Sequence, residues 1–494
     1  GAGASSGMAM AHWEIQGWMI LILGWVFVPF YTRSMVYTMP EFLERRYNPQ
    51  SRTILSVISL VSYVLTKVAV TVYAGGLVFQ QVFGIKELWG IDFFWIAAIG
   101  LVVLTALYTI FGGMKSVLYT SVLQTPILLL GSLIILVLGF KELGGWDEMM
   151  RVCGAVTVND YGDTMTNLIR SNDDANFPWL GALIGSAIIG FWYWCTDQFI
   201  VQRVLSGKNE MEARRGTIFG AYLKLTPVFL FLIPGMVAFA MQKHGITVNG
   251  ETFTMSSADA AFPTLVAKLL PAGFKGLVVC GILAALMSSL ASLFNSSAML
   301  FTIDFYKKYR PKASEKTLLY VGRVATVVVV VLGILWIPVM KSVGSVLYNY
   351  LQDVQSVLAP GIAAAFLLGI CSKKATPKGG MWGLIAGFII GITRLGAKVY
   401  YTSGATFSDS WFKYLFYDTN WLFFCGGMLL FCMLVIVVVS RFTTPAPAEQ
   451  IVGLTFGSTT DEQKAVTRAS WNKWDVIHSA IIILITVVFY WYFW

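Results

Sequence analysis

The sequence predicts an all-α integral membrane protein with about twelve transmembrane helices. Of its 494 residues, 57% are hydrophobic and only 12% are charged, whereas soluble domains carry roughly 25% charged residues. The mean hydropathy is +0.70. Apolar stretches of about 20 residues, the length that crosses roughly 30 Å of hydrocarbon, recur along the whole chain. A soluble fold could not bury this much apolar surface.

The apolar stretches divide the chain into its predicted elements. They cover residues 10–31, 53–83, 91–111, 117–140, 177–202, 214–242, 273–302, 318–341, 346–370, 379–400, 418–440 and 475–494. The stretch at 53–83 is long for one crossing, so we expect it to be tilted or to extend beyond the bilayer. We predict a transporter core over 1–441, a cytoplasmic linker over 442–474 and a last transmembrane helix over 475–494.

Lysine and arginine are distributed unevenly between the loops. The formal net charge is +9, but the basic residues form short clusters between apolar stretches, which argues against a nucleic-acid partner. If loops alternate sides, 22 of the 35 Lys and Arg residues lie on one side, and the positive-inside rule places that side in the cytoplasm. We therefore expect a multi-pass protein of a plasma membrane or bacterial inner membrane, with the lipid bilayer as a partner.

Cysteine and histidine give no sign of a cofactor or of catalysis. Five of the six cysteines lie in or at the ends of apolar stretches, so we expect free thiols and no disulfide framework. The three histidines do not have the spacing of a zinc site. No nucleophile with a base and no phosphate-binding loop is recognisable. The sequence therefore predicts a protein that is not an enzyme and has no cofactor.

Charged residues within the apolar stretches are the first candidates for function. A charge near the bilayer centre costs about 2.5 to 3.5 kcal/mol on insertion scales, so each one needs a reason. The alternative to a binding role is that such side chains snorkel to the interface or pair between helices. The candidates are Glu14, Lys67, Asp197, Lys224 and Asp353.

Three polar segments interrupt the apolar stretches. Residues 191–198 combine a run of aromatic side chains with Asp197 and Gln198, which favours a helix interrupted at a binding site over an interfacial aromatic belt. Residues 285–297 carry serines at helical spacing, which suits either close helix packing or the hydroxyl and carbonyl ligands of sodium. Gln352, Asp353 and Gln355 offer hydrogen bonds to a neutral polyhydroxylated ligand, although a structural role fits them equally.

Through these and other segments the sequence resembles the sodium/solute symporter family, and within it the sodium/glucose cotransporter branch. The motifs are specific and extend over almost the whole chain. They are Tyr37-Thr-Met-Pro-Glu-Phe-Leu-Glu-Arg-Arg, Tyr108-Thr-Ile-Phe-Gly-Gly, Trp192-Tyr-Trp-Cys-Thr-Asp-Gln, Gln202-Arg203, Tyr222-Leu-Lys-Leu and Ser288-Ser-Leu-Ala-Ser-Leu-Phe-Asn-Ser.

The resemblance implies a LeuT-like fold of two five-helix inverted repeats with extra peripheral helices. It also implies a symporter that imports a monosaccharide such as glucose or galactose with sodium, by alternating access. On this resemblance, sodium is held by the carbonyl of Ala285 and the hydroxyls of Ser288 and Ser289, and no other metal is expected. The residues matched to the sugar site are Glu14, Lys224 and Gln352, with Tyr193 as the gate below the sugar, Trp194 beside it and Tyr348 as the outer gate.

Three features depart from the family pattern. The first core helix of the family is expected to precede Gly1. The sequence Trp13-Glu14-Ile15 replaces the usual aromatic-Glu-Trp. Ser121 stands where many members have an aspartate linked to a second sodium site or to the exit of the ion, so we expect one sodium per sugar.

Two alternatives remain open at this point. The solute could be an inositol, a sialic acid, an amino acid or a carboxylate, because the family carries all of these. The chain could also be a membrane sensor that binds solute without transporting it.

Overall fold

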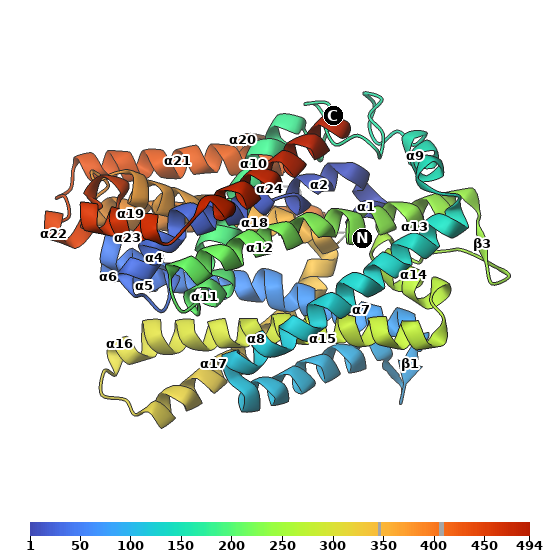
Figure 1. The fold of residues 1–494 in the computed structure, drawn as a ribbon, viewed down its shortest axis with the longest axis horizontal. Coiled ribbons are helices and arrows are strands. Elements are labelled where there is room, and N and C mark those ends of the chain that lie inside the picture. Colours follow the sequence, from blue (N-terminus) through green and yellow to red (C-terminus); the bar gives the residue numbers. More distant parts are fainter. Residues whose placement is uncertain (344–346, 405–409) are drawn as a thin grey trace.

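The computed structural model describes residues 1–343, 347–404 and 410–494, and the chain there is almost entirely helical (Figure 1). Eleven helices of the described residues are long and apolar enough to cross a membrane, and Phe93–Leu107 is a shorter apolar helix. Two small antiparallel hairpins lie in loops. They pair β1 (Glu87–Leu88) with β2 (Ile91–Asp92) and β3 (Thr247–Val248) with β4 (Glu251–Thr252). The prediction of an all-helical membrane protein is confirmed.

The first half of the chain forms helices that often contain a short π-helical segment. In order they are α1 (Ala2–Ser6), η1 (Gly7–Met10), α2 (Ala11–Glu14), α3 (Gly17–Ile22), η2 (Leu23–Phe27), α4 (Val28–Ser34), α5 (Met39–Arg46), α6 (Pro49–Ser62), η3 (Tyr63–Val68), α7 (Ala69–Phe83), α8 (Phe93–Leu143), α9 (Trp146–Gly154), α10 (Trp179–Phe191), η4 (Trp192–Thr196), α11 (Gln198–Leu205), α12 (Glu210–Pro227), η5 (Val228–Leu232) and α13 (Ile233–His244).

The second half has longer uninterrupted helices and a linker with short ones. These elements are η6 (Ala258–Ala260), α14 (Ala261–Leu269), α15 (Ala272–Phe301), η7 (Thr302–Tyr306), α16 (Lys307–Tyr309), α17 (Glu315–Val343), α18 (Leu347–Cys371), α19 (Pro377–Thr402), α20 (Ser410–Lys413), η8 (Tyr414–Asp418), α21 (Trp421–Arg441), α22 (Ala448–Ile451), η9 (Phe456–Ser458), α23 (Asp461–Ala469) and α24 (Lys473–Tyr492).

The two ends of the bundle carry different loops. In Figure 1, α5, α11, α16, α22 and α23 gather at the left, and these belong to the loops that are rich in Lys and Arg. The hairpins β1 and β3 and the helices α9 and α14 lie at the right. Alternate loops therefore lie at opposite ends, as the charge distribution predicts.

The first predicted span differs from the structure. Helix begins at Ala2 rather than near residue 10, and it is interrupted at Ile15 and Gln16, where ψ is 32° and 28°. Small residues allow this segment to pack closely, because a Cβ on Gly3 would meet the carbonyl oxygen of Leu232 at 2.0 Å. Hydropathy identifies the apolar stretch but does not show where its backbone leaves the helix.

The two spans predicted at 91–111 and 117–140 lie within one helical element, α8, of 51 residues. A straight helix of that length would measure about 76 Å, more than twice the hydrocarbon thickness. Figure 1 shows its two halves at a steep angle, with the second half crossing back toward the end where the first half starts. The segment between the two spans, which we expected to be a loop, is helical. Its two consecutive glycines, Gly112 and Gly113, destabilise a helix by only about 1 kcal/mol each, so they do not prevent it from continuing.

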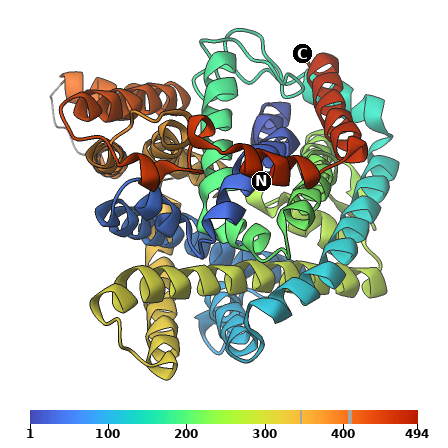
Figure 2. The same ribbon diagram turned by 60° about the vertical axis from the view of Figure 1, so that its left-hand side comes forward.

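The linker predicted at 442–474 passes across the end of the bundle. Figure 2 shows it running from α21 to α24. Gln450 donates hydrogen bonds to the carbonyl oxygens of Arg45 and Tyr47, at 3.1 and 3.0 Å. Near its other end, Ser470 donates to Glu210 at 3.0 Å. The linker is thus tied to α5 and α12.

Arg46, the last residue of the motif that starts at Tyr37, binds the C-terminal end of α18. The fully buried Arg46 donates to the carbonyl oxygens of Gly369, Ser372 and Ala375, at 2.5 to 3.2 Å, and so satisfies one carbonyl in the last turn of α18 and two in the segment that follows it. Burial raises the pKa of Tyr47 to about 12, against the opposing effect of Arg46, so its hydroxyl stays protonated and donates to Ala365 O. These contacts fix the helix that carries Tyr348 and Gln352.

Candidate substrate and ion sites

The aromatic segment at 191–198 interrupts a membrane-spanning helix, as predicted. Helix α10 passes into the π-helical η4, and Asp197 then has φ −81° and ψ 126°, which is extended backbone. Asp197 restarts the helix as the N-cap of α11, because its Oδ1 accepts a hydrogen bond from Phe199 N at 3.1 Å. The break leaves Tyr193 and Trp194 on a distorted turn in the middle of the bundle.

A second interruption positions Glu14. Helix α2 ends at Glu14, and Gln16 begins the next segment with its Nε2 donating to the carbonyl oxygen of Ser186 on α10 at 2.8 Å. A Cβ on Gly190 would meet the Gln16 amide oxygen at 2.5 Å, so this glycine makes room for that contact. Two interrupted segments therefore lie against each other.

The residues matched to the sugar site come together from four helical segments. Lys224 Nζ on α12 lies 2.7 Å from Glu14 Oε2 and 5.5 Å from the ring centroid of Trp194 on η4. The hydroxyl of Tyr348 on α18 donates to Glu14 Oε1, and Gln352 lies one turn further along α18 within reach of that hydroxyl. The Oε1 of Gln352 is buried and accepts no hydrogen bond from the residues that the structure describes.

A cavity opens from this cluster. It has a volume of about 400 Å³ and is lined by Glu14, Asp259 and Tyr348, by the first three residues of the chain and by apolar side chains of α7, η5, α14 and α18. Tyr348 lines the cavity, whereas the buried Gln352 does not. A pocket with an apolar wall and a few converging polar groups is the usual form of a small-molecule site.

Tyr193 lies beside this cluster. Its ring centroid is 5.0 Å from that of Trp194, in an edge-to-face arrangement. Lys67 Nζ lies 5.0 Å from the Tyr193 ring centroid. Tyr193 therefore contacts Trp194 of this cluster and also lies near a second buried ion pair.

That second pair joins Lys67 on η3 to Asp197. Tyr63 donates to Asp197 Oδ1 at 3.0 Å, and four aromatic rings lie within 6 Å of Lys67 Nζ. Both charges lie in apolar stretches and were therefore predicted to be costly. Their pairing was not predicted from the sequence, because the two residues are 130 positions apart. The sequence analysis also missed Lys398 on α19, which pairs with Asp353. A lysine near the end of a predicted span can reach the interface, so it was not singled out.

The residues matched to the sodium site lie on α15, which packs along α8. The Oγ of Ser288 and the Oγ of Ser121 on α8 are 2.7 Å apart. Ala285 and Ser289 are partly buried on the same helix. Ser121, at the position where the family often has an aspartate, is therefore adjacent to the predicted sodium ligands. In the described parts of the chain, no cluster of three or more His, Cys, Asp or Glu could hold a metal ion.

The interrupted helices, the buried polar cluster and the packing of α15 on α8 define a LeuT-like secondary transporter. A solved structure of the substrate-bound outward-open state of a Na+-coupled sialic acid symporter has the same fold. Its TM-score is 0.68 at 21% identity, over 90% of this chain and 86% of that chain.

Sequence comparisons identify the family. The model of the sodium:solute symporter family matches residues 1–387. Sodium/glucose cotransporter 1 of Ovis aries is 38% identical over 469 residues, which are 90% of this chain and 70% of that protein. Human sodium/glucose cotransporter 4 is 38% identical over 475 residues, 92% of this chain and 69% of that protein. The chain belongs to the sodium:solute symporter family.

Proposed function

We propose that this protein is a secondary active symporter that imports a neutral monosaccharide, such as glucose or galactose, together with sodium. The observation that carries this proposal is the ion pair between Glu14 and Lys224 beside Trp194. The pair supplies charged donors and acceptors while its own formal charges cancel.

A neutral sugar fits these groups. Its hydroxyls both donate and accept, so they can bridge the Glu14 carboxylate and the Lys224 ammonium. The free Oε1 of Gln352 adds a further acceptor, and the indole of Trp194 offers an apolar face to a sugar ring. An anionic solute would require an uncompensated positive charge, which this pair does not leave. The relatives named as sodium/glucose cotransporters support the same substrate class.

Sodium supplies the driving force in this proposal. A neutral sugar gains nothing from the membrane potential, whereas one sodium moving through 100 mV releases about 2.3 kcal/mol. At about 1.4 kcal/mol per decade, this sustains roughly 40-fold accumulation at one ion per sugar. Coupling requires sodium to bind the outward-open state more tightly, because an ion with equal affinity for both states shifts nothing. Ala285, Ser288 and Ser289 are the proposed ligands.

A panel of labelled solutes tests the substrate class. The purified protein is reconstituted in liposomes, and uptake of glucose, galactose, myo-inositol, sialic acid and proline is measured with an inward sodium or potassium gradient. We expect sodium-dependent uptake of a hexose above all others. Preference for sialic acid or proline would contradict the sugar assignment, and binding without uptake would favour a sensor.

A further inference from the structure

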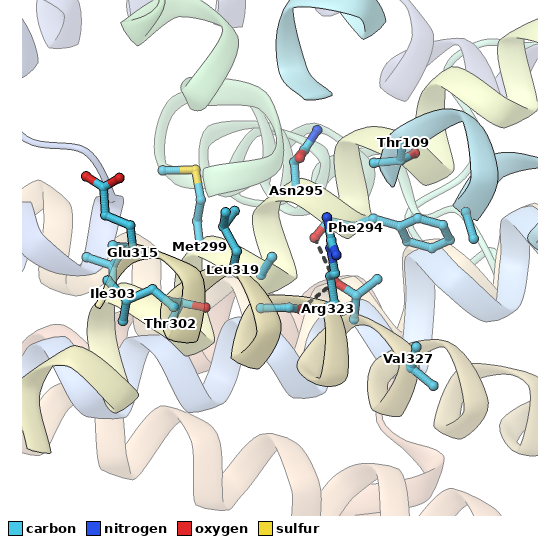
Figure 3. Close-up of a pocket in the computed structure, with 15 residues that line it drawn as sticks. Thr109, Phe294, Asn295, Met299, Thr302, Ile303, Glu315, Leu319, Arg323 and Val327 are labelled. Atoms are coloured by element: carbon cyan, nitrogen blue, oxygen red, sulfur yellow. Dashed lines mark hydrogen bonds between the residues drawn. The ribbon is translucent and has the colours of Figure 1, made fainter. Parts of the chain in front are cut away.

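A groove on the membrane-facing side of the bundle lies outside the transport site. It runs between α15 and α17, next to the end of the first half of α8, and has a volume of about 580 Å³. Its walls are largely apolar, as Phe294, Met299, Leu319 and Val327 in Figure 3 illustrate. Leu319 and Val327 are 63% and 60% exposed although both belong to a candidate membrane span. In a membrane, such an apolar surface is covered by lipid acyl chains.

One cation lies within this apolar groove. Arg323 lines it and is exposed, and no acidic side chain among residues 1–343, 347–404 and 410–494 forms an ion pair with it. Figure 3 shows Glu315 at one end of the groove and Arg323 farther along it. Arg323 is eight residues beyond the start of α17, or about 12 Å along the helix axis. Arg323 therefore belongs to a candidate membrane span, and an anion would stabilise its guanidinium, because an uncompensated charge near hydrocarbon is costly.

The charge around the groove is mainly positive. Between residues 305 and 323 the chain has six Lys and Arg residues and a single acid, Glu315. Arginine binds phosphate with two parallel hydrogen bonds, and its long apolar stem can lie along the groove while its head reaches the headgroup level.

We propose that the groove between α15 and α17 binds one anionic phospholipid of the cytoplasmic leaflet, with an acyl chain along the apolar walls and the headgroup phosphate held by Arg323. The site is separate from Glu14 and Lys224, so the proposal is independent of the transported solute. It makes the lipid a structural partner of α15, the helix that carries the predicted sodium ligands.

A neighbouring groove provides an internal comparison. It lies on the other side of α17, has a volume of about 650 Å³ and is lined by apolar and tyrosine side chains with no Lys or Arg. An acyl chain can enter it, but nothing in its lining selects a headgroup. Selectivity for an anionic lipid therefore depends on Arg323 rather than on the presence of a groove.

The test measures lipid binding to the delipidated full-length protein by native mass spectrometry. Phosphatidylglycerol and phosphatidylcholine with the same chains are titrated against wild type, Arg323→Gln and the loop variant Lys312→Gln. We expect wild type to prefer phosphatidylglycerol by about fivefold, the factor that ~1 kcal/mol for one basic residue at a membrane surface gives. Arg323→Gln abolishes this preference, whereas Lys312→Gln, outside the groove, retains most of it.

Two further measurements complete the test. Ala298→Phe fills the groove from α15, so it should lose tight phosphatidylglycerol binding while the melting temperature and sodium-dependent uptake confirm that the variant is folded. Inorganic phosphate should not displace the lipid. The proposal would be overturned if wild type bound the two lipids equally, or if inorganic phosphate alone displaced the lipid. It would also be overturned if Arg323→Gln or Ala298→Phe kept an undiminished preference for phosphatidylglycerol.

Discussion

Lys224 Nζ lies 2.7 Å from Glu14 Oε2, so one ion pair joins α12 to the interrupted first helix across 210 residues of sequence. Both side chains are largely shielded from solvent, with 14% and 16% of their surface exposed. The pair can hold the two segments together, and it also presents a donor and an acceptor to a ligand.

Lys224→Met should abolish sugar uptake, because the ligand loses its ammonium donor. Removing one partner of a shielded pair can cost about 3 to 5 kcal/mol of stability, so the melting temperature must be measured in parallel. The double variant Glu14→Gln with Lys224→Met should regain much of that stability and remain inactive. Lys398→Met, which breaks a different lysine–carboxylate pair, the one with Asp353, is the matched control. Full uptake by the folded Lys224→Met protein would remove Lys224 from the site.

Tyr348→Phe tests the outer residue of the cluster. The ring that lines the cavity remains, but the hydrogen bond to Glu14 is lost. We expect a rise in the KM for sugar of about fivefold, corresponding to roughly 1 kcal/mol for one hydrogen bond. The maximal rate should change less. A KM unchanged from wild type would show that the hydroxyl does not organise the site.

The hydroxyls of α15 are predicted to bind sodium. Ser288→Ala and Ser289→Ala should raise the sodium concentration needed for half-maximal uptake while leaving the ranking of sugars unchanged, because they remove hard oxygen ligands. Ser292→Ala, on the same helix and bonded to Arg203, serves as the control. If sugar selectivity changed and sodium dependence did not, the assignment of these serines would be wrong.

Ser121 bears on the number of ions. Its hydroxyl is 2.7 Å from that of Ser288, so Ser121→Asp would place a carboxylate next to the predicted sodium ligands. We expect wild type to move one sodium per sugar, and the variant to bind sodium more tightly or to move a second ion. The readout is the ratio of labelled sodium to labelled sugar. A wild-type ratio of two would refute the single-ion prediction.

Lys67 and Asp197 give a prediction about stability. Both are almost fully buried, at 7% and 2% side-chain exposure. Lys67→Met leaves Asp197 without its cation and should destabilise the protein by about 3 to 5 kcal/mol. Lys67→Met combined with Asp197→Asn should recover part of this loss. A single variant as stable as wild type in a thermal melt would show that the charges are compensated elsewhere.

Sequence alone predicted most of the fold and the helix break before Asp197, because hydropathy and a polar aromatic run are local signals. It did not predict the break at Ile15 and Gln16, since apolar residues on both sides mask it. Nor did it give the pairing of Lys67 with Asp197, because that contact depends on how distant helices pack. The residues of the proposed sugar site came from motif resemblance, and the structure brings Glu14, Lys224, Tyr348 and Trp194 together.

Uphill transport tests the central claim most directly. Proteoliposomes are equilibrated with labelled glucose at the same concentration on both sides, and an inward sodium gradient with a negative interior potential is then imposed. We predict net accumulation of glucose in the lumen and none when potassium replaces sodium. At one sodium per sugar, the potential alone allows roughly 40-fold accumulation per 100 mV, and the ratio of the sodium concentrations multiplies that limit. Glucose that stays at equal concentration on both sides under the sodium gradient would contradict sodium-coupled sugar symport by this protein.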